Sequence, residues 1–108
     1  MTAAGFRKLA LQLPEATEGE HFGVADFRVV NKIFATLAYE KQGCGVLMLT
    51  PEQQEGVDAD APEIFSPVPN AWGRKGATVV KLSAVNTDIL KAALRTAWLR
   101  RAPKKLHT

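Results

Sequence analysis

The chain has 108 residues, of which 46% are hydrophobic and 23% are charged, and its formal net charge is +3. These are the size and composition of one compact globular domain, and they exclude a disordered chain, a collagen-like repeat and a coiled-coil rod. No apolar run approaches the roughly 20 residues that a transmembrane helix needs. The single cysteine excludes an intramolecular disulfide and favours a reducing compartment, so we expect one cytoplasmic domain over residues 1–108.

The charge is distributed unevenly along the chain. Residues 41–70 carry one lysine and five acidic residues, whereas residues 71–108 carry nine lysines and arginines and one aspartate. An acidic middle beside a basic C-terminal third predicts a dipolar surface that can attract polyanions. The same pattern also fits a solvated helix and tail, so charge alone leaves both interpretations open.

The first 40 residues are predicted to form a helix and a β-hairpin. Apolar residues at helical spacing predict a helix over Thr2–Leu13, which the following proline ends. The segment Pro14–Val24, with its two glycines and three glutamates, is predicted to be a loop. Ala25–Val30 and Ile33–Tyr39 are predicted strands that Asn31-Lys32 joins as a two-residue turn. Both faces of this hairpin are partly apolar, which predicts a central place in a sheet.

A third strand and a short helix follow. Gly45–Leu49 is a continuous apolar run and is predicted to be a strand. Thr50 is a good helix N-cap, Pro51 suits the first helical position and Gln53 completes a capping box. Gly56 is expected to end this helix.

Two more strands are predicted before the last helix. Ile64-Phe65 begins an extended segment that Pro67 and Pro69 restrict to the edge of a sheet. Asn70–Gly76 is predicted to be a turn, and Ala77–Leu82 alternates as a strand does.

The last predicted helix begins at Thr87 as its N-cap, and its core-facing part is expected to end near Leu99. Pro103 prevents continuation, so residues 102–108 are expected to form a basic tail. The apolar stripe of this helix consists of Ile89, Leu90, Ala93, Leu94, Ala97 and Trp98. The predicted core consists of Phe6, Phe27, Val29, Phe34, Leu47, Val80, Leu94 and Trp98.

The sequence carries no recognisable signature of an enzyme or a metal site. His21 and Cys44 are isolated from other ligands, and the spacings that zinc sites use are absent. The loop glutamates Glu15, Glu18 and Glu20 are interpreted as solvated charges. We therefore predict no catalytic residue, no metal ligand and no cofactor. A nucleophilic Cys44–His21 pair is the alternative, and it would need a proximity that sequence does not show.

The most distinctive segment is Asn70–Gly76, which places Trp72, Arg74 and Lys75 between two extended stretches. A hairpin tip of this composition can place its cations on phosphates while the indole stacks on a base. In the alternative interpretation Trp72 folds back over the sheet edge and the cations keep the turn in water.

Several segments in this order resemble a known family. They are Leu13–Glu18, His21–Gly23, Asp26–Val29, Lys32–Leu37, Leu49–Gln53, Trp72-Gly73 and Val79–Leu82, followed by the closing amphipathic helix. Over roughly residues 4–103 the chain resembles the MmcQ/YjbR family, although many members have glycine where Asn31 stands. The resemblance implies a small two-layer α/β domain with an antiparallel sheet, similar to type III secretion chaperones. It also implies the family's common label, DNA binding, and it implies no catalytic residues.

We therefore expect a two-layer α+β fold of order α-β-β-β-α-β-β-α and a non-enzymatic binding function. The first hypothesis is weak, sequence-tolerant DNA binding through the basic C-terminal third. Its expected contact residues are Trp72, Arg74, Lys75, Arg95, Arg100, Arg101, Lys104 and Lys105. The alternative is a protein-interaction or chaperone-like module that acts as a homodimer; neither hypothesis involves a membrane.

Overall fold

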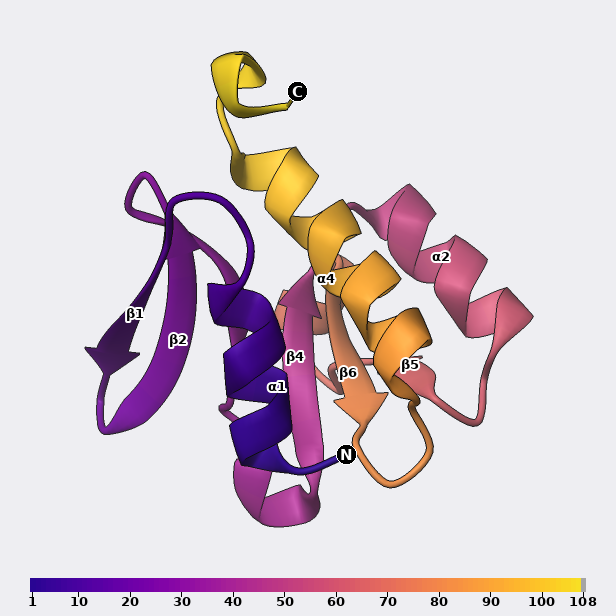
Figure 1. The fold of residues 1–108 in the computed structure, drawn as a ribbon. Coiled ribbons are helices and arrows are strands. Elements are labelled where there is room, and N and C mark those ends of the chain that lie inside the picture. The colour runs from indigo at the N-terminus through magenta and orange to yellow at the C-terminus, as the bar shows by residue number, and fades with distance from the viewer. Residues whose placement is uncertain (108) are drawn as a thin grey trace.

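Six antiparallel strands in the order β1-β2-β3-β4-β6-β5 form the sheet around which this chain folds (Figure 1). The computed structural model describes residues 1–107. In chain order the elements are α1 (Ala3–Leu11), β1 (Ala16–His21), β2 (Val24–Val29), β3 (Lys32–Thr36), the 3-10 helix η1 (Glu40–Gln42), β4 (Cys44–Met48), α2 (Pro51–Asp60), β5 (Phe65–Pro67), α3 (Ala71–Arg74), β6 (Ala77–Lys81), α4 (Thr87–Arg101) and the 3-10 helix η2 (Lys104–Leu106). This architecture confirms the predicted α+β class and the predicted order of elements, to which β1 and the short α3 are added. No helix in these residues is long and apolar enough to span a membrane.

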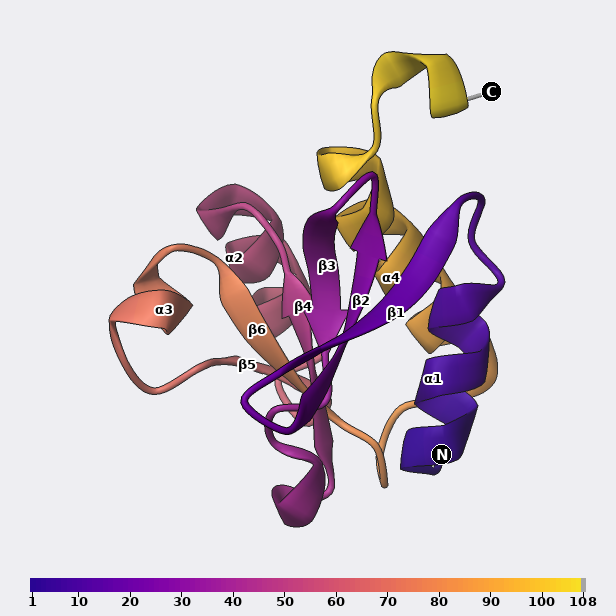
Figure 2. The ribbon, with the colours of Figure 1, turned by 90° about the vertical axis from the view of Figure 1, so that its left-hand side faces the viewer.

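Helices α1 and α4, from opposite ends of the chain, lie side by side and cover one face of the sheet (Figures 1 and 2). The main core lies between these helices and the strands, and α2 contributes Val57 and Ala61 to its margin. The eight residues predicted to form the core are all 0–1% exposed, so that prediction is confirmed. Trp98 is fully buried in this core, and its Nε1 donates a hydrogen bond to the carbonyl oxygen of Pro14 at 2.9 Å. This bond ties α4 to the segment that follows α1.

The opposite face of the sheet, which we call the open face, carries a second and smaller apolar cluster. Strand alternation produces it, because neighbouring residues of β4 and β6 point to opposite faces. Figure 2 shows α3 on this side of the strands and α1 on the other. The cluster consists of Cys44, Val46, Met48, Val68, Ala77 and Val79, with Ile33, Tyr39 and Trp72 packed against it.

The prediction of a loop over Pro14–Val24 is wrong, because β1 occupies most of it. The strand pairs with β2 along its whole length, from Ala16 opposite Val29 to His21 opposite Val24. Backbone pairing therefore stabilises a polar segment that has little strand propensity of its own. Gly19, which the sequence suggests as a breaker, lies within this strand beside the paired side chains of Asp26 and Arg28. A Cβ at Gly19 would lie 2.8 Å from the carboxylate of Asp26.

Three predicted boundaries also shift. The turn between β2 and β3 is Val30-Asn31 in place of Asn31-Lys32, and both residues have positive φ, at 49° and 64°. The capping box at Thr50 is confirmed, but α2 continues beyond Gly56 to Asp60. Asn86, not Thr87, caps α4, since its side chain accepts a hydrogen bond from the backbone of Ile89.

The segment predicted to be a basic tail folds back on the domain. Ala102 is buried, Leu106 packs against the main core, and His107 Nε2 lies 2.8 Å from the carbonyl oxygen of Ala102. Thr108, the last residue of that predicted tail, lies outside the described residues.

Candidate functional site

Four of the eight residues predicted to contact DNA line one cavity. Trp72 comes from α3, Lys75 follows α3, and Arg100 and Arg101 come from the last turn of α4. The cavity has a volume of about 170 Å³, and Met48, Leu49 and Ala77 complete its lining. We call it the cationic cavity. Its lining comes from three segments that lie some 25 residues apart in sequence: the end of β4, the turn around α3 and the last turn of α4.

Three hydrogen bonds, two of them buried, hold the turn that carries Trp72 and Lys75. The side chain of Asn70 caps α3 by accepting from the backbone N–H of Trp72 at 2.8 Å. From α2, the buried Gln54 amide donates to the carbonyl oxygens of Gly73 and Ala77, each at 2.9 Å. Because Gly73 lies within the turn and Ala77 follows it, this amide fixes the turn against α2.

Two neighbouring guanidinium groups give the cavity its charge. Arg100 Nη1 donates to the carbonyl oxygen of Met48 at 3.3 Å, and desolvation, followed by the charge of Arg101, lowers the pKa of Arg100. Arg101 Nε is a buried donor without an acceptor in the described residues. No carboxylate lines this cavity among residues 1–107. A bound anion would therefore accept a hydrogen bond from Arg101 Nε and balance the positive charge of the two arginines.

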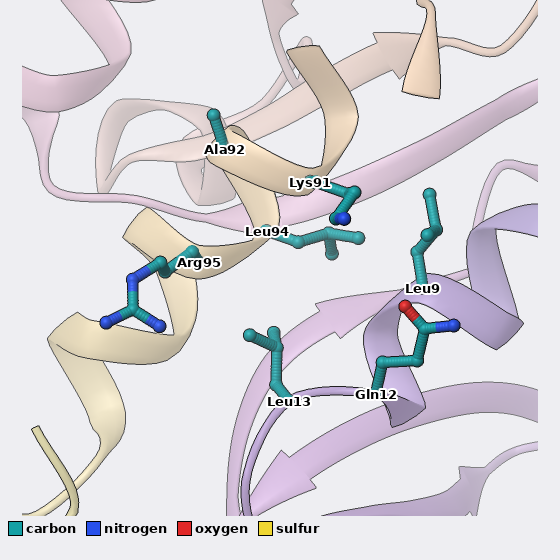
Figure 3. A pocket seen from close by; sticks show the side chains of 7 residues that line it. All are labelled: Leu9, Gln12, Leu13, Lys91, Ala92, Leu94 and Arg95. Atoms are coloured by element: carbon teal, nitrogen blue, oxygen red, sulfur yellow. The ribbon is translucent and has the colours of Figure 1, made fainter. Parts of the chain in front are cut away.

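The remaining predicted contact residues lie elsewhere. Arg95 and Lys91 border a groove of about 390 Å³ between α1 and α4, whose floor is formed by Leu9, Leu13 and Leu94 (Figure 3). Arg95 and Arg100 are five residues apart on α4, which separates them by roughly 140° around the helix axis.

Arg74 is exposed on α3, and Lys104 and Lys105 are exposed in η2. The guanidinium of Arg95 lies 5.9 Å from the ring centre of Trp98. The structure thus gathers Trp72, Lys75, Arg100 and Arg101 and leaves the other four outside their cavity.

A second hollow lies next to the cationic cavity and was not anticipated from the sequence. It is a groove of about 290 Å³ on the open face, and it shares Trp72 and Met48 with the cationic cavity. Its lining is His21, Phe22, Val24, Asp26, Ile33, Thr36, Ala38, Met48 and Trp72. Phe22 is 93% exposed, in the turn between β1 and β2. The sequence signal that could have indicated this groove is Phe22, an aromatic residue inside the polar segment Pro14–Val24, which contains two glycines.

The two residues considered for nucleophilic chemistry lie in different places. His21 lines the groove on the open face, whereas Cys44 lines a separate cavity beside the first residues of the chain. The thiol of Cys44 is buried at the start of β4 and contacts the carbonyl oxygen of Gln42 at 3.5 Å. No group of three or more His, Cys, Asp or Glu side chains comes together within residues 1–107 to hold a metal ion.

Comparison with known proteins agrees with this fold. The YjbR family model matches residues 11–100. The structure is similar to the crystal structure of the Deinococcus radiodurans protein DR2400, designated a DUF419 domain, with a TM-score of 0.74 and 23% sequence identity over 96% of this chain and 80% of that one. No curated protein matches the chain. Because the family match spans most of the chain and the described fold agrees with a solved neighbour, this chain belongs to the YjbR family.

Proposed function

We propose that this chain is a non-enzymatic binding protein and that its cationic cavity binds the phosphate backbone of DNA. The observation that carries the proposal is the meeting of Lys75, Arg100 and Arg101 around one cavity that no carboxylate of the described residues lines. Arginine and lysine donors of this kind contact phosphate oxygens and carry no base readout by themselves. The proposal assigns no chemistry to His21 or Cys44.

The geometry supports weak and sequence-tolerant binding. The cations come from two separate segments, a turn and the last turn of α4, and not from the exposed face of a single helix that reads base edges in the major groove. Most of the binding free energy then comes from release of counterions, and affinity falls steeply with salt.

Affinity for a generic DNA duplex across a salt series tests this proposal. The double variant Lys75→Ala/Arg101→Ala is expected to lower the slope of log affinity against log salt by about 1.8, since each phosphate contact contributes about 0.9. The control Lys32→Ala/Lys41→Ala removes the same charge from exposed sites outside the cavity. We expect the control to keep the wild-type slope.

Equal loss of slope in both double variants would show that total charge, and not the cavity, determines binding. Absence of any binding near 50 mM salt, where non-specific contacts are favoured, would contradict the proposal altogether.

A second candidate is supported by a separate observation. The exposed ring of Phe22 and the apolar groove on the open face form a surface suited to an interface with another protein or with a second copy of this chain. This candidate predicts a dimer in sedimentation equilibrium, whereas DNA binding at the cationic cavity requires no self-association.

A further inference from the structure

We propose that the groove on the open face binds an unpaired base of single-stranded nucleic acid, with an adjacent phosphate in the cationic cavity. This inference rests on the proposed function and specifies its substrate class. It starts from the adjacency of the two hollows, because Trp72 and Met48 line both of them. One ligand with a flat apolar part next to an anionic part would fill the pair.

The groove offers aromatic surface at residues that come from distant segments. Trp72 is half-buried and packs on the second cluster, while the ring of Phe22 is almost fully exposed. The ring of His21 lies 4.4 Å from that of Phe22, centre to centre. Single-strand binding proteins combine aromatic surfaces of this kind, on which bases stack, with a cationic track for the backbone.

The backbone of Phe22 is held in a conformation that disfavours it. Its φ is +52°, in a turn whose next residue, Gly23, has a φ of +76°. The left-handed region costs a residue other than glycine roughly 1–2 kcal/mol. The chain therefore presents a large apolar ring to solvent at a position where glycine or asparagine would be less strained. A role for the ring outside the fold accounts for both features.

The charges around the groove suit a polyanion. Glu18 pairs with Arg7 of α1 and so lies on the helix-covered side of β1. Alternation along the strand then places Thr17, Gly19 and His21 on the open face.

Asp26 is the carboxylate of the described residues that lines the groove, and Arg28 neutralises it. The guanidinium donates to both carboxylate oxygens, at 2.8 and 3.0 Å, and the bond raises the pKa of Arg28. A phosphate chain that runs along this side therefore meets three cations and no free carboxylate among the lining residues.

An unpaired base fits these surfaces better than a duplex does. In a duplex the faces of the bases are stacked on one another, and only their edges and the phosphates reach a protein. The exposed surface of the groove is almost entirely apolar, so it offers few partners to base edges but can receive the face of an exposed base. The occupant is therefore expected to be single-stranded.

Fluorescence anisotropy with a short thymidine oligonucleotide and a duplex of the same length tests the inference. At about 50 mM salt we expect the single strand to bind more tightly than the duplex. Phe22→Ala is expected to weaken single-strand binding roughly 5- to 150-fold, the usual effect of losing one stacked base, and to leave the salt slope and the duplex affinity unchanged. Val30→Ala is the matched control, because Val30 is also an exposed apolar residue at positive φ in a hairpin turn but does not line the groove.

Three results would overturn the inference in distinguishable ways. Equal affinity for both probes together with an unaffected Phe22→Ala variant would refute base binding and leave the proposed function intact. Failure to bind either probe would refute the proposed function, and the inference with it. A wild-type dimer that Phe22→Ala dissociates, with DNA binding unchanged, would assign the groove to self-association.

Discussion

Replacing Trp98 with alanine tests the packing that positions the end of α4 and its arginines. The indole is 0% exposed between α1 and the sheet, and its Nε1 donates to the carbonyl oxygen of Pro14 at 2.9 Å. Removing a buried tryptophan to alanine costs about 3–5 kcal/mol through lost burial and the cavity left behind. The lost hydrogen bond adds about 1 kcal/mol, so the total is about 4–6 kcal/mol.

Two further variants separate these contributions. Trp98→Phe keeps most of the ring but loses the donor, and we expect it to cost about 1–3 kcal/mol. Ile89→Ala is the control on the same helix, because Ile89 is 38% exposed although the sequence pattern places it on the apolar stripe. We expect Ile89→Ala to cost less than about 1 kcal/mol.

Urea unfolding followed by far-ultraviolet circular dichroism measures all three variants without relying on tryptophan fluorescence. Domains of this size have a total stability of about 5–15 kcal/mol, so Trp98→Ala is expected to be strongly destabilised or unfolded at room temperature. A Trp98→Ala variant within about 1 kcal/mol of wild type would refute the packing of α4 and, with it, the placement of Arg100 and Arg101.

Two other substitutions test the hydrogen bonds that hold the turn carrying Trp72 and the partly buried carboxylate of Asp58. Gln54→Leu removes both hydrogen bonds to the carbonyls of Gly73 and Ala77, and we expect a loss of about 1–3 kcal/mol in urea unfolding and weaker DNA binding; an unchanged stability would contradict the bridging role. Burial raises the pKa of Asp58, whose Oδ1 has no hydrogen-bond partner in the described residues. The folded-state pKa therefore lies above the unfolded value, and ionisation of Asp58 lowers stability as the pH rises through that folded-state pKa. Asp58→Asn is expected to raise the melting temperature at pH 7, with a gain that disappears when the pH falls to about 4 or below; an equal gain at both pH values would exclude ionisation as the cause.

The core could be predicted from the sequence because its signals are local and mutually consistent. Periodic apolar residues place Phe6 and Trp98 on the buried faces of α1 and α4, and both are fully buried. The capping box at Thr50 is likewise a short-range pattern with its own hydrogen bonds, and the structure contains both of them.

The strand β1 could not be predicted from its own residues. Its sequence is polar and contains Gly19, and its stability comes mainly from backbone pairing with β2, to which the exposed Glu18–Arg7 ion pair adds little. Such tertiary support overrides the weak propensity of a segment. Because β1 was not predicted, the groove on the open face was not predicted either: the turn after β1 places Phe22 in the lining of that groove.

The site was predictable in its residue types and not in their arrangement. An excess of cations in the C-terminal third pointed to Lys75, Arg100 and Arg101 together with Arg95. Helix rotation separates Arg95 from the others and places it beside α1. Which cations meet depends on where the last turn of α4 lies relative to the turn that carries Lys75, and that is a property of the whole fold.

An NMR titration of nitrogen-15-labelled protein with a short thymidine oligonucleotide tests the central claim most directly, because it locates the bound anion. We expect the largest shifts at the indole N–H of Trp72, the Nε–H of Arg101 and the backbone amide of Gly23 beside Phe22. These shifts should diminish together as salt is added. Shifts confined to Lys91 and Arg95 at the groove between α1 and α4, or no shifts at low salt, would contradict the account.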